Sequence, residues 1–271
     1  METQQKLAKL KEILKKLDKV AIAYSGGVDS TFLLKVAHDV LKDKVLAITA
    51  RSSTYPEREY NEAIGFVKQL GVKHLTIVSE ELDIEGFSGN PVNRCYFCKK
   101  ELFTKISQVA EEHGIPYIAD GSNTDDLGDY RPGMTAMKEM GVVSPLREAG
   151  MSKDDIRLLS KEMGLPTWDK QPFACLASRF PYGQEITRDK LRMVDRAEQF
   201  MLDTGFRQIR VRIHGDMARI EVSPQERKKF FDEALMDKVH QGLKEIGFKY
   251  VALDLKGYRT GSMNEVIDTG K

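Results

Sequence analysis

Long apolar runs are missing from this sequence, and neither sign of charge is in excess. No uninterrupted run of about eighteen apolar residues occurs, so no membrane-spanning helix is expected. Lysine plus arginine number 42 and aspartate plus glutamate 41, which argues against a nucleic-acid partner. Residues 4–19 place apolar side chains on one helical face between lysines and lack the continuous core of a signal peptide. A cytoplasmic protein without a membrane partner is therefore expected.

Cysteine is also scarce, because only Cys95, Cys98 and Cys175 occur. In the cytoplasm such residues are more often metal ligands or reactive thiols than disulfides. The C-x-x-C spacing of Cys95 and Cys98 suits one metal, one cluster or a redox disulfide, and no histidine spacing completes a closed zinc site. Three thiolates on a 4Fe-4S cluster would leave one iron without a protein ligand. The alternatives are a reactive Cys175 without a cluster, and Cys95 and Cys98 as buried small residues with Cys175 an incidental thiol.

What is present begins with a loop between a predicted strand and a predicted helix. The apolar run at residues 20–24 predicts a buried strand, and helical spacing follows the sequence Ser25-Gly26-Gly27-Val28-Asp29-Ser30. A helix N-terminus attracts phosphate, and Gly26 and Gly27 are expected to adopt positive φ and allow close approach. The spacing excludes G-x-x-x-x-G-K-S/T and G-x-G-x-x-G. It matches S-G-G-x-D-S and resembles the pyrophosphate loop (PP-loop) of ATP pyrophosphatases, which implies that these six residues bind ATP.

Strands and helices alternate through the first half of the chain. Strands are predicted at 20–24, 44–49, 73–78 and 117–121, with helices at 56–70 and 99–113 between them. This order predicts an α/β fold with a parallel, doubly wound sheet, like that of adenine nucleotide alpha hydrolases. The ligand site is expected beyond the carboxyl ends of the strands, where the PP-loop, residues 51–53 with Arg51, and residues 121–126 would meet.

The pattern changes after a helix with a capping box at Ser152–Asp155 and a stop at Gly164. We predict a PP-loop ATP pyrophosphatase domain at residues 1–166 and a substrate-binding and sulfur-transfer domain at 167–271. The second begins with an irregular connector at 167–184 and is expected to be a smaller α+β domain. Its predicted elements are helices at 190–202 and 225–246, a hairpin of 208–213 and 218–222, and a strand at 250–255.

Three further segments carry a family resemblance over essentially the whole chain. They are Cys175–Gly183, Asp120–Asn123 with Asp129–Gly133, and Arg210-Val211-Arg212 with Ala218–Glu221. Together they resemble the LarE family, ATP-dependent sulfur transferases that make the nickel-pincer nucleotide cofactor of lactate racemase. The resemblance implies that ATP adenylates a carboxylate of pyridinium-3,5-dicarboxylic acid mononucleotide and that sulfur from the Cys175 site then displaces AMP. Repetition on the second carboxylate gives the bis-thiocarboxylic acid.

The resemblance also implies roles for single residues and partners. Cys175 is the catalytic residue, and the substrate mononucleotide contacts Ser178, Arg179, Arg210, Arg212 and Glu221. Family members either sacrifice one cysteine sulfur or hold three cysteines and pass sulfide through a 4Fe-4S cluster, and Cys95, Cys98 and Cys175 match the second type. Mg²⁺ is expected on the ATP phosphates near Asp29. A sulfide or sulfur donor and a hexameric homo-oligomer, with the apolar face of residues 4–19 as a contact, are further expectations.

Other interpretations use the same motifs. A tRNA thiolase combines this loop with three cysteines, but the near-neutral charge and the lack of a recognisable RNA-binding domain disfavour it. An amide-forming ATP pyrophosphatase would need an ammonia source and would leave Cys175 without a task. A non-catalytic nucleotide-binding module would not explain Cys175 beside Ser178 and Arg179. On an edge strand, Arg210 and Arg212 could also be solvated surface residues, and Glu221 could form an ion pair with a nearby arginine.

Overall fold

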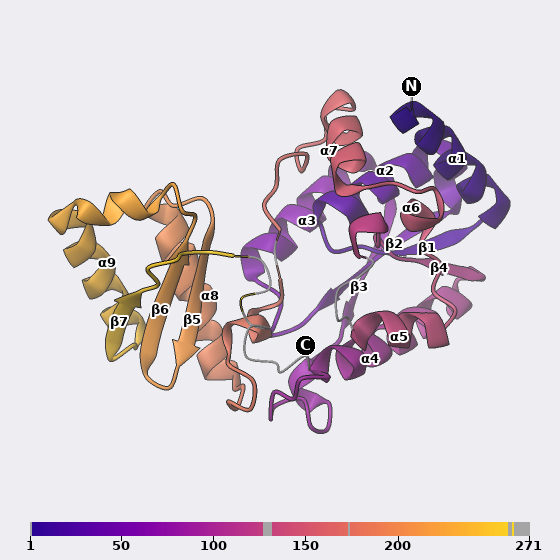
Figure 1. Cartoon of the computed structure of the whole chain (residues 1–271). Coiled ribbons are helices and arrows are strands. Elements are labelled where there is room, and N and C mark those ends of the chain that lie inside the picture. Colours follow the sequence, from indigo (N-terminus) through magenta and orange to yellow (C-terminus); the bar gives the residue numbers. More distant parts are fainter. Residues whose placement is uncertain (1, 127–131, 173, 260–261, 263–271) are drawn as a thin grey trace, which may run out of the picture. The chain divides into compact units, whose positions relative to one another are not determined.

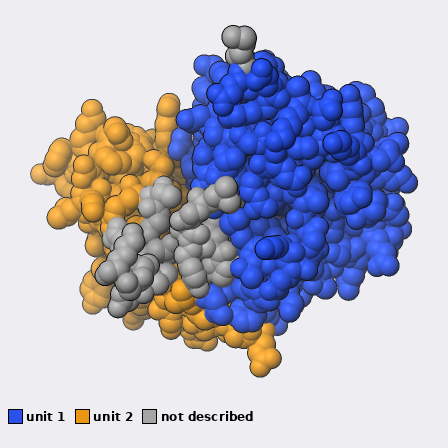
Figure 2. All heavy atoms as spheres, turned by 45° about the vertical axis from the view of Figure 1, so that its right-hand side comes forward, with its two compact units in different colours: residues 1–84, 93–173 blue, residues 85–92, 174–271 orange. Residues whose placement is uncertain are grey.

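The computed structural model describes residues 2–126, 132–172, 174–259 and 262. The chain forms two compact units, one of residues 1–84 and 93–173 and one of residues 85–92 and 174–271 (Figure 2). Among the described residues, no helix combines the length and the apolar character needed to cross a membrane. Short 3₁₀ helices are η1 (Lys42–Lys44), η2 (Glu81–Asp83), η3 (Thr124–Asp126), η4 (Leu176–Arg179) and η5 (Arg227–Phe231).

A four-stranded parallel sheet forms the centre of the first unit, which confirms the predicted α/β fold. Its strands are β1 (Val20–Ala23), β2 (Val45–Arg51), β3 (Lys73–Val78) and β4 (Tyr117–Ala119), in the order β3-β2-β1-β4. β1 pairs with β2 and β4, and the side chains of Val20, Ala21 and Ile22 are fully buried. A run of apolar residues without alternation is typical of such a central parallel strand, because helices cover both of its faces.

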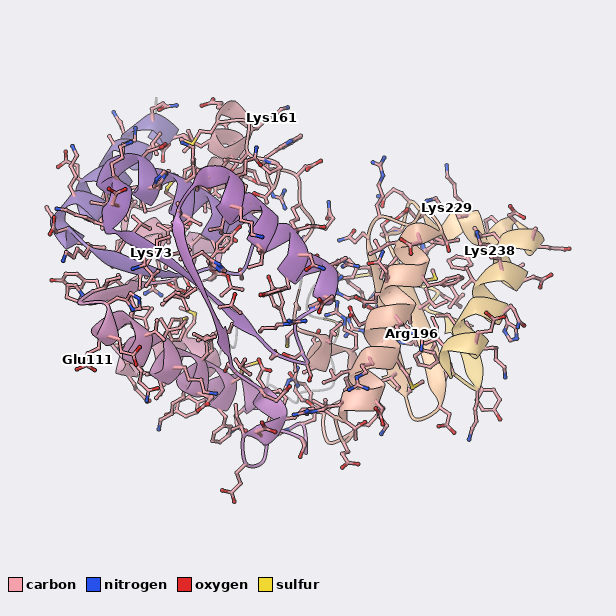
Figure 3. The ribbon with its side chains drawn as sticks, turned by 180° about the vertical axis from the view of Figure 1, so that it is seen from behind. Lys73, Glu111, Lys161, Arg196, Lys229 and Lys238 are labelled. Atoms are coloured by element: carbon pink, nitrogen blue, oxygen red, sulfur yellow. The ribbon has the colours of Figure 1, made fainter. Side chains whose placement is uncertain are left out.

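Two helical layers cover the sheet of the first unit (Figure 1). Val20 and Ile22 pack in one core with helices of one layer, whereas Ala21 packs in a second core with Phe103 and Ile106 of the other. This division follows from the alternation of side chains along a strand. Lys161 and Glu111 mark the two layers in Figure 3. The layers consist of α1 (Glu2–Leu17), α2 (Val28–Leu41), α3 (Glu57–Leu70), α6 (Pro145–Glu148) and α7 (Lys153–Glu162) on one face, and α4 (Arg94–Glu112) and α5 (Pro132–Glu139) on the other.

The amphipathic face of α1 is occupied within the chain itself. Leu7, Leu10 and Leu14 are buried in the core that contains β1 and α2. Each such side chain stabilises the fold by about 1.5–3 kcal/mol relative to an exposed one. The expectation that this face contacts another subunit is therefore wrong.

The second unit is the predicted smaller α+β structure. Its sheet has the order β5-β6-β7, with β5 (Ile209–His214) antiparallel to β6 (Met217–Val222) and β6 parallel to β7 (Tyr250–Leu253). The hairpin places Arg212 opposite Arg219, and Gly215 supplies the positive φ of the turn. The helices are α8 (Arg188–Asp203) and α9 (Glu233–Ile246).

Two predicted helix boundaries are wrong. Residues 225–246 do not form one helix, because η5 ends at Phe231 and α9 begins after Asp232, whose carboxylate accepts the amides of Ala234 and Leu235. An aspartate in this position caps a new helix N-terminus. α4 begins at Arg94 rather than near residue 99, so Cys95 and Cys98 lie in a helical turn instead of a preceding loop.

Residues 85–92 belong to the second unit although the first surrounds them in sequence. The Asn90 side chain is fully buried and donates to the carbonyls of Phe180 at 3.2 Å and Pro181 at 2.7 Å. The amide of Ile186 donates to the carbonyl of Ser88 at 2.8 Å. These bonds attach residues 85–92 to the segment that follows Cys175.

Candidate active site

The PP-loop joins β1 to the N-terminus of α2. The hydroxyls of Ser25 and Ser30 lie 3.1 Å apart, and Ser30 also donates to the carbonyl of Gly27. Gly26 has a φ of +66°, as predicted, but Gly27 is extended at −76° and is the N-cap residue of α2. The prediction of positive φ at both glycines is therefore wrong for Gly27. The first amides of α2 have no partner within the helix, so this end of α2 suits an anion.

The next helix, α3, lies close against the PP-loop. A Cβ atom at Gly26 would lie 2.7 Å from the Cβ of Ala63 and 3.2 Å from its Cα. The hydroxyl of Tyr55 donates to the carbonyl of Ser25 at 2.7 Å. The absence of a Cβ atom at Gly26 therefore permits both the left-handed backbone conformation and the close contact with α3. Arg51, at the carboxyl end of β2, binds Glu57 at 3.1 Å and lies over the Tyr60 ring.

Residues 121–126 pack against the PP-loop, as predicted from the sheet topology. Gly121 approaches so closely that a Cβ there would lie 3.0 Å from the amide nitrogen of Ser30. The side-chain amide of Asn123 donates to Asp29 Oδ1 at 3.3 Å. Asp126 accepts the amide of Asn123 at 2.9 Å, so this carboxylate caps its own turn. Asp129, Tyr130 and Arg131, which carried part of the resemblance, lie outside the described residues.

Lys153 is a site residue that sequence reasoning missed. Its ammonium group forms an ion pair with Asp29, and both side chains are mostly buried. Lys153 is the first residue of α7, and its amide donates to Asp125 Oδ2 at 2.8 Å. A lysine placed here can bind the anion that enters the PP-loop. The only signal in the sequence is its position directly after the Ser152 cap.

The N-terminus of α7 is held by the predicted capping box and by α1. The Ser152 side chain accepts a hydrogen bond from the Asp155 amide, and the Asp155 side chain accepts one from the Ser152 amide. The Asp155 carboxylate also accepts hydrogen bonds from Thr3 Oγ1 at 2.7 Å and Lys6 Nζ at 2.8 Å. Burial of the Asp155 carboxyl raises its pKa, but the hydrogen bonds from Lys6, Ser152 and Thr3 outweigh this and hold the pKa far below its ordinary value. Asp155 thus remains ionised and anchors the helix that carries Lys153.

Two cysteines lie on the first turns of α4. Cys95 is exposed and Cys98 half-buried, neither forms a disulfide, and their spacing of three residues places both on one side of the helix. The Cys98 sulfur lies 3.7 Å from Glu81 Oε1, and burial raises the pKa of Glu81. The two thiols are suitable donors for an iron–sulfur cluster. In the described part of the chain, no three Cys, His, Asp or Glu side chains group closely enough to hold a metal ion.

Cys175 lies in the second unit and precedes η4. Arg179, at the end of η4, is 1% exposed and donates to the carbonyls of Ala174 and Cys175 at 2.6 and 3.1 Å. The same nitrogen donates to Ser178 Oγ at 2.8 Å. The remaining side of the guanidinium binds Glu198 with two bonds of 2.8 Å. Arg179 therefore holds the backbone that carries Cys175.

Arg210 and Arg212 project from β5 as the alternation predicts. Arg212 binds Glu221 at 2.6 and 2.9 Å and donates to the carbonyl of Ser178 at 2.7 Å. Arg210 lies over the Tyr258 ring. Burial, followed by repulsion from the nearby Arg179, lowers the pKa of Arg210 to about 10. Both arginines are buried, so they are not the solvated surface pair of the alternative interpretation.

Arginine–carboxylate ion pairs gather in this part of the second unit. Glu198 binds Arg179, Glu221 accepts hydrogen bonds from both Arg212 and Arg219, and Asp254 pairs with Arg219 and Arg259. Guanidinium groups of this kind are also suited to binding a phosphate or a carboxylate.

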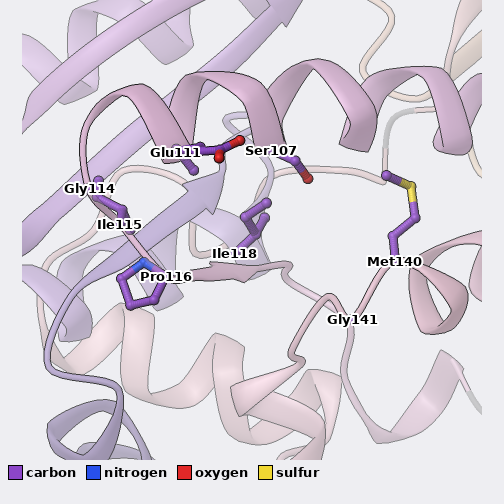
Figure 4. Close-up of a pocket in the computed structure, with 9 residues that line it drawn as sticks. Ser107, Glu111, Gly114, Ile115, Pro116, Ile118, Met140 and Gly141 are labelled. Carbon is purple, nitrogen blue, oxygen red and sulfur yellow. The ribbon is translucent and has the colours of Figure 1, made fainter.

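A cavity of about 550 Å³ lies elsewhere in the first unit, between α4 and β4 (Figure 4). Ser107 and Glu111 line it from α4, Ile118 from β4, and Met140 from the turn that follows α5. It contains none of the predicted site residues. Pro116 places it beside the N-terminal end of β4, whereas ligands of parallel sheets bind beyond the carboxyl ends.

Comparison with known proteins gives relatives for the whole chain. Residues 3–88 match the NAD synthase family model. The chain is 37% identical to the pyridinium-3,5-bisthiocarboxylic acid mononucleotide synthase of Lactiplantibacillus plantarum, over 97% of this chain and 95% of the relative. It is 44% identical to an uncharacterised protein of Synechocystis sp., over 97% and 98%. Similarity to the glutamine-hydrolysing GMP synthase of Aeropyrum pernix, at 27% identity, covers only 67% of this chain and 39% of the relative.

Proposed function

The chain belongs to the LarE family of PP-loop ATP pyrophosphatases, that of the pyridinium-3,5-bisthiocarboxylic acid mononucleotide synthase, and we propose that it catalyses this sulfur insertion. It is an ATP-dependent sulfurtransferase that forms AMP and pyrophosphate. The observation that carries the proposal is the similarity along 97% of the chain, which includes both the PP-loop and the segment of Cys175. We assign ATP activation to the first unit, and substrate binding with sulfur transfer to the second.

The first step takes place at the PP-loop. A carboxylate oxygen of pyridinium-3,5-dicarboxylic acid mononucleotide attacks the α-phosphorus of ATP, and the bond to the β-phosphate breaks to release pyrophosphate. The amides of the loop and the ammonium group of Lys153 bind the leaving pyrophosphate. The Asp29 carboxylate offers the oxygen donors that Mg²⁺ prefers, and Mg²⁺ would neutralise charge on the phosphates.

The second step takes place at Cys175. A sulfur nucleophile attacks the acyl carbon, the carbon–oxygen bond to AMP breaks, and a thiocarboxylate forms. Arg210 and Arg212 bind the phosphate of the mononucleotide, with Ser178 beside them and Glu221 holding Arg212 in place. A second round on the other carboxylate gives the bis-thiocarboxylic acid.

We propose a 4Fe-4S cluster on Cys95, Cys98 and Cys175 as the sulfur carrier. Cys95 is exposed, Cys98 is half-buried, and both lie on one side of α4. Thiolates are the usual ligands of iron–sulfur clusters, which supports this proposal. With three protein ligands, such a cluster would leave one iron open to hydrosulfide. Iron and acid-labile sulfide per chain after anaerobic reconstitution should fall sharply in Cys95→Ala. A colourless protein that loses sulfur mass from Cys175 on turnover would instead establish sacrifice of the cysteine.

The function is tested by incubation with ATP, Mg²⁺, sulfide and the dicarboxylate mononucleotide. We expect AMP, pyrophosphate and a thiocarboxylate product by mass spectrometry, and Cys175→Ala should retain pyrophosphate exchange but lose the thiocarboxylate. Absence of both AMP and thiocarboxylate would overturn the assignment, and thiolated tRNA in a parallel reaction would favour a tRNA thiolase. We further propose a cytoplasmic homohexamer of 30.7 kDa chains, to be tested by light scattering.

A further inference from the structure

A fully buried ion pair lies at the centre of the second unit. Arg179 and Glu198 are each 1% exposed, and two bonds of 2.8 Å join the guanidinium to the carboxylate. Burial raises the pKa of Glu198, but Arg179 outweighs this and lowers it, so both groups stay charged. Glu198 occupies a position on the apolar face of α8, between the buried Val194 and Met201, so its spacing marks it as a buried charge.

The pair connects two segments that carry the chemistry. On one side, Arg179 donates to the carbonyls of Ala174 and Cys175. On the other side, Glu198 Oε1 accepts the amide of Val211 at 3.0 Å. Val211 lies on β5 directly between Arg210 and Arg212. One side chain, Glu198, therefore contacts both the strand of the anion-binding arginines and the arginine that holds the cysteine backbone.

Stability alone does not account for this arrangement. Well-packed apolar residues can replace a buried ion pair with little loss of stability, because desolvation of two charges offsets their attraction. Apolar residues cannot, however, bind two carbonyls on one segment and an amide on another. Charged side chains with forked ends can form all of these bonds at once, and together the bonds fix the distance between the two segments.

We propose that Arg179 and Glu198 are positioning residues that fix Cys175 relative to Arg210 and Arg212. This inference rests on the proposed function, in which sulfur at Cys175 must reach the acyl carbon of a substrate whose phosphate is bound by Arg210 and Arg212. The pair does not itself touch the reacting atoms. Its loss should impair sulfur transfer and leave adenylation intact, because the PP-loop belongs to the other unit.

The main test uses Glu198→Gln, which keeps the shape of the side chain and removes its charge. At saturating substrate, ATP–pyrophosphate exchange should stay within about twofold of wild type. Single-turnover thiocarboxylate formation should fall at least about tenfold. Glu226→Gln is the matched control, because Glu226 also accepts backbone amides of this unit, those of Arg207 and Gln208. The control should change neither rate.

Further measurements keep the proposal falsifiable if Glu198→Gln does not fold. Arg179→Lys retains the charge pair but loses the fork, and it should show the same division between exchange and transfer. In the wild type, the amides of Ser178 and Phe180, which bond within this segment, should exchange with deuterium as slowly as those of β5. Equal loss of both rates, unchanged transfer in a folded variant, or fast exchange at these amides would overturn the inference. A wild type that makes no thiocarboxylate would instead refute the proposed function, and deuterium exchange would still test the pair.

Discussion

Substitution of Gly26 by alanine tests the geometry of the PP-loop most directly. At a φ of +66°, a residue with a Cβ atom costs about 1–2 kcal/mol. The new methyl group would also lie 2.7 Å from the Cβ of Ala63, with the Ala63 backbone behind it, so α3 must shift. Overpacking of this kind costs about 1–3 kcal/mol. We therefore expect Gly26→Ala to destabilise the first unit by about 2–5 kcal/mol.

Gly71→Ala separates the two contributions. Gly71 has a similar φ of +71°, but an added Cβ there meets no atom within 4 Å. Gly71→Ala should therefore destabilise the protein by only about 1–2 kcal/mol. The midpoints of thermal denaturation of Gly26→Ala and Gly71→Ala should differ by about 2–12 °C. In an Ala63→Gly background, which itself carries the cost of a glycine within α3, Gly26→Ala should destabilise the protein by about 1–3 kcal/mol less than it does in the wild type. Equal destabilisation by Gly26→Ala and Gly71→Ala, or the same cost of Gly26→Ala in both backgrounds, would refute the close approach of α3 to the loop.

Two further predictions concern α7. Lys153→Ala removes a charge-assisted contact of about 1.5–3 kcal/mol, so kcat/KM for ATP should fall by about 10–150-fold in pyrophosphate release. Lys161→Ala, on the same helix but over the Trp168 ring, should stay within about twofold, and equal effects of the two would contradict the role of Lys153. The pKa of Asp155 is lower in the folded state than its ordinary value of 3.8. The ionised carboxylate therefore stabilises the folded protein at pH values above 3.8, and this contribution is lost progressively as the pH falls below 3.8. Lys6→Met should weaken this acid dependence in thermal unfolding measured between about pH 6 and pH 3; an unchanged pH profile would speak against the bond to Asp155.

Local patterns in the sequence were sufficient for the PP-loop, the parallel sheet and the Ser152 capping box. Each depends on residues that are neighbours in the chain, such as the apolar run of β1 or the three-residue spacing of Ser152 and Asp155. The alternation of Arg210 and Arg212 was predicted correctly for the same reason. The helix break at Asp232 was missed because apolar periodicity continues across it and hides the cap.

Contacts between distant residues could not be predicted in this way. Lys153 meets Asp29 from 124 positions away, and nothing near either residue indicates the partner. Glu198 lies on the apolar face of α8, which indicates a buried charge, but nothing near it in the sequence names Arg179, 19 positions earlier, as its partner. Gly27 is extended because it caps α2, whereas composition alone treats the two glycines of the loop alike.

The membership of residues 85–92 in the second unit bears on how the gene can be divided. The polypeptide passes between the units three times, after residues 84, 92 and 173, so no single cut separates them. A fragment of residues 1–173 would retain Asn90 without the Phe180 and Pro181 carbonyls that its amide binds. A chimera that takes the second unit from a relative must therefore exchange two stretches of sequence, and the short one is as indispensable as the long one.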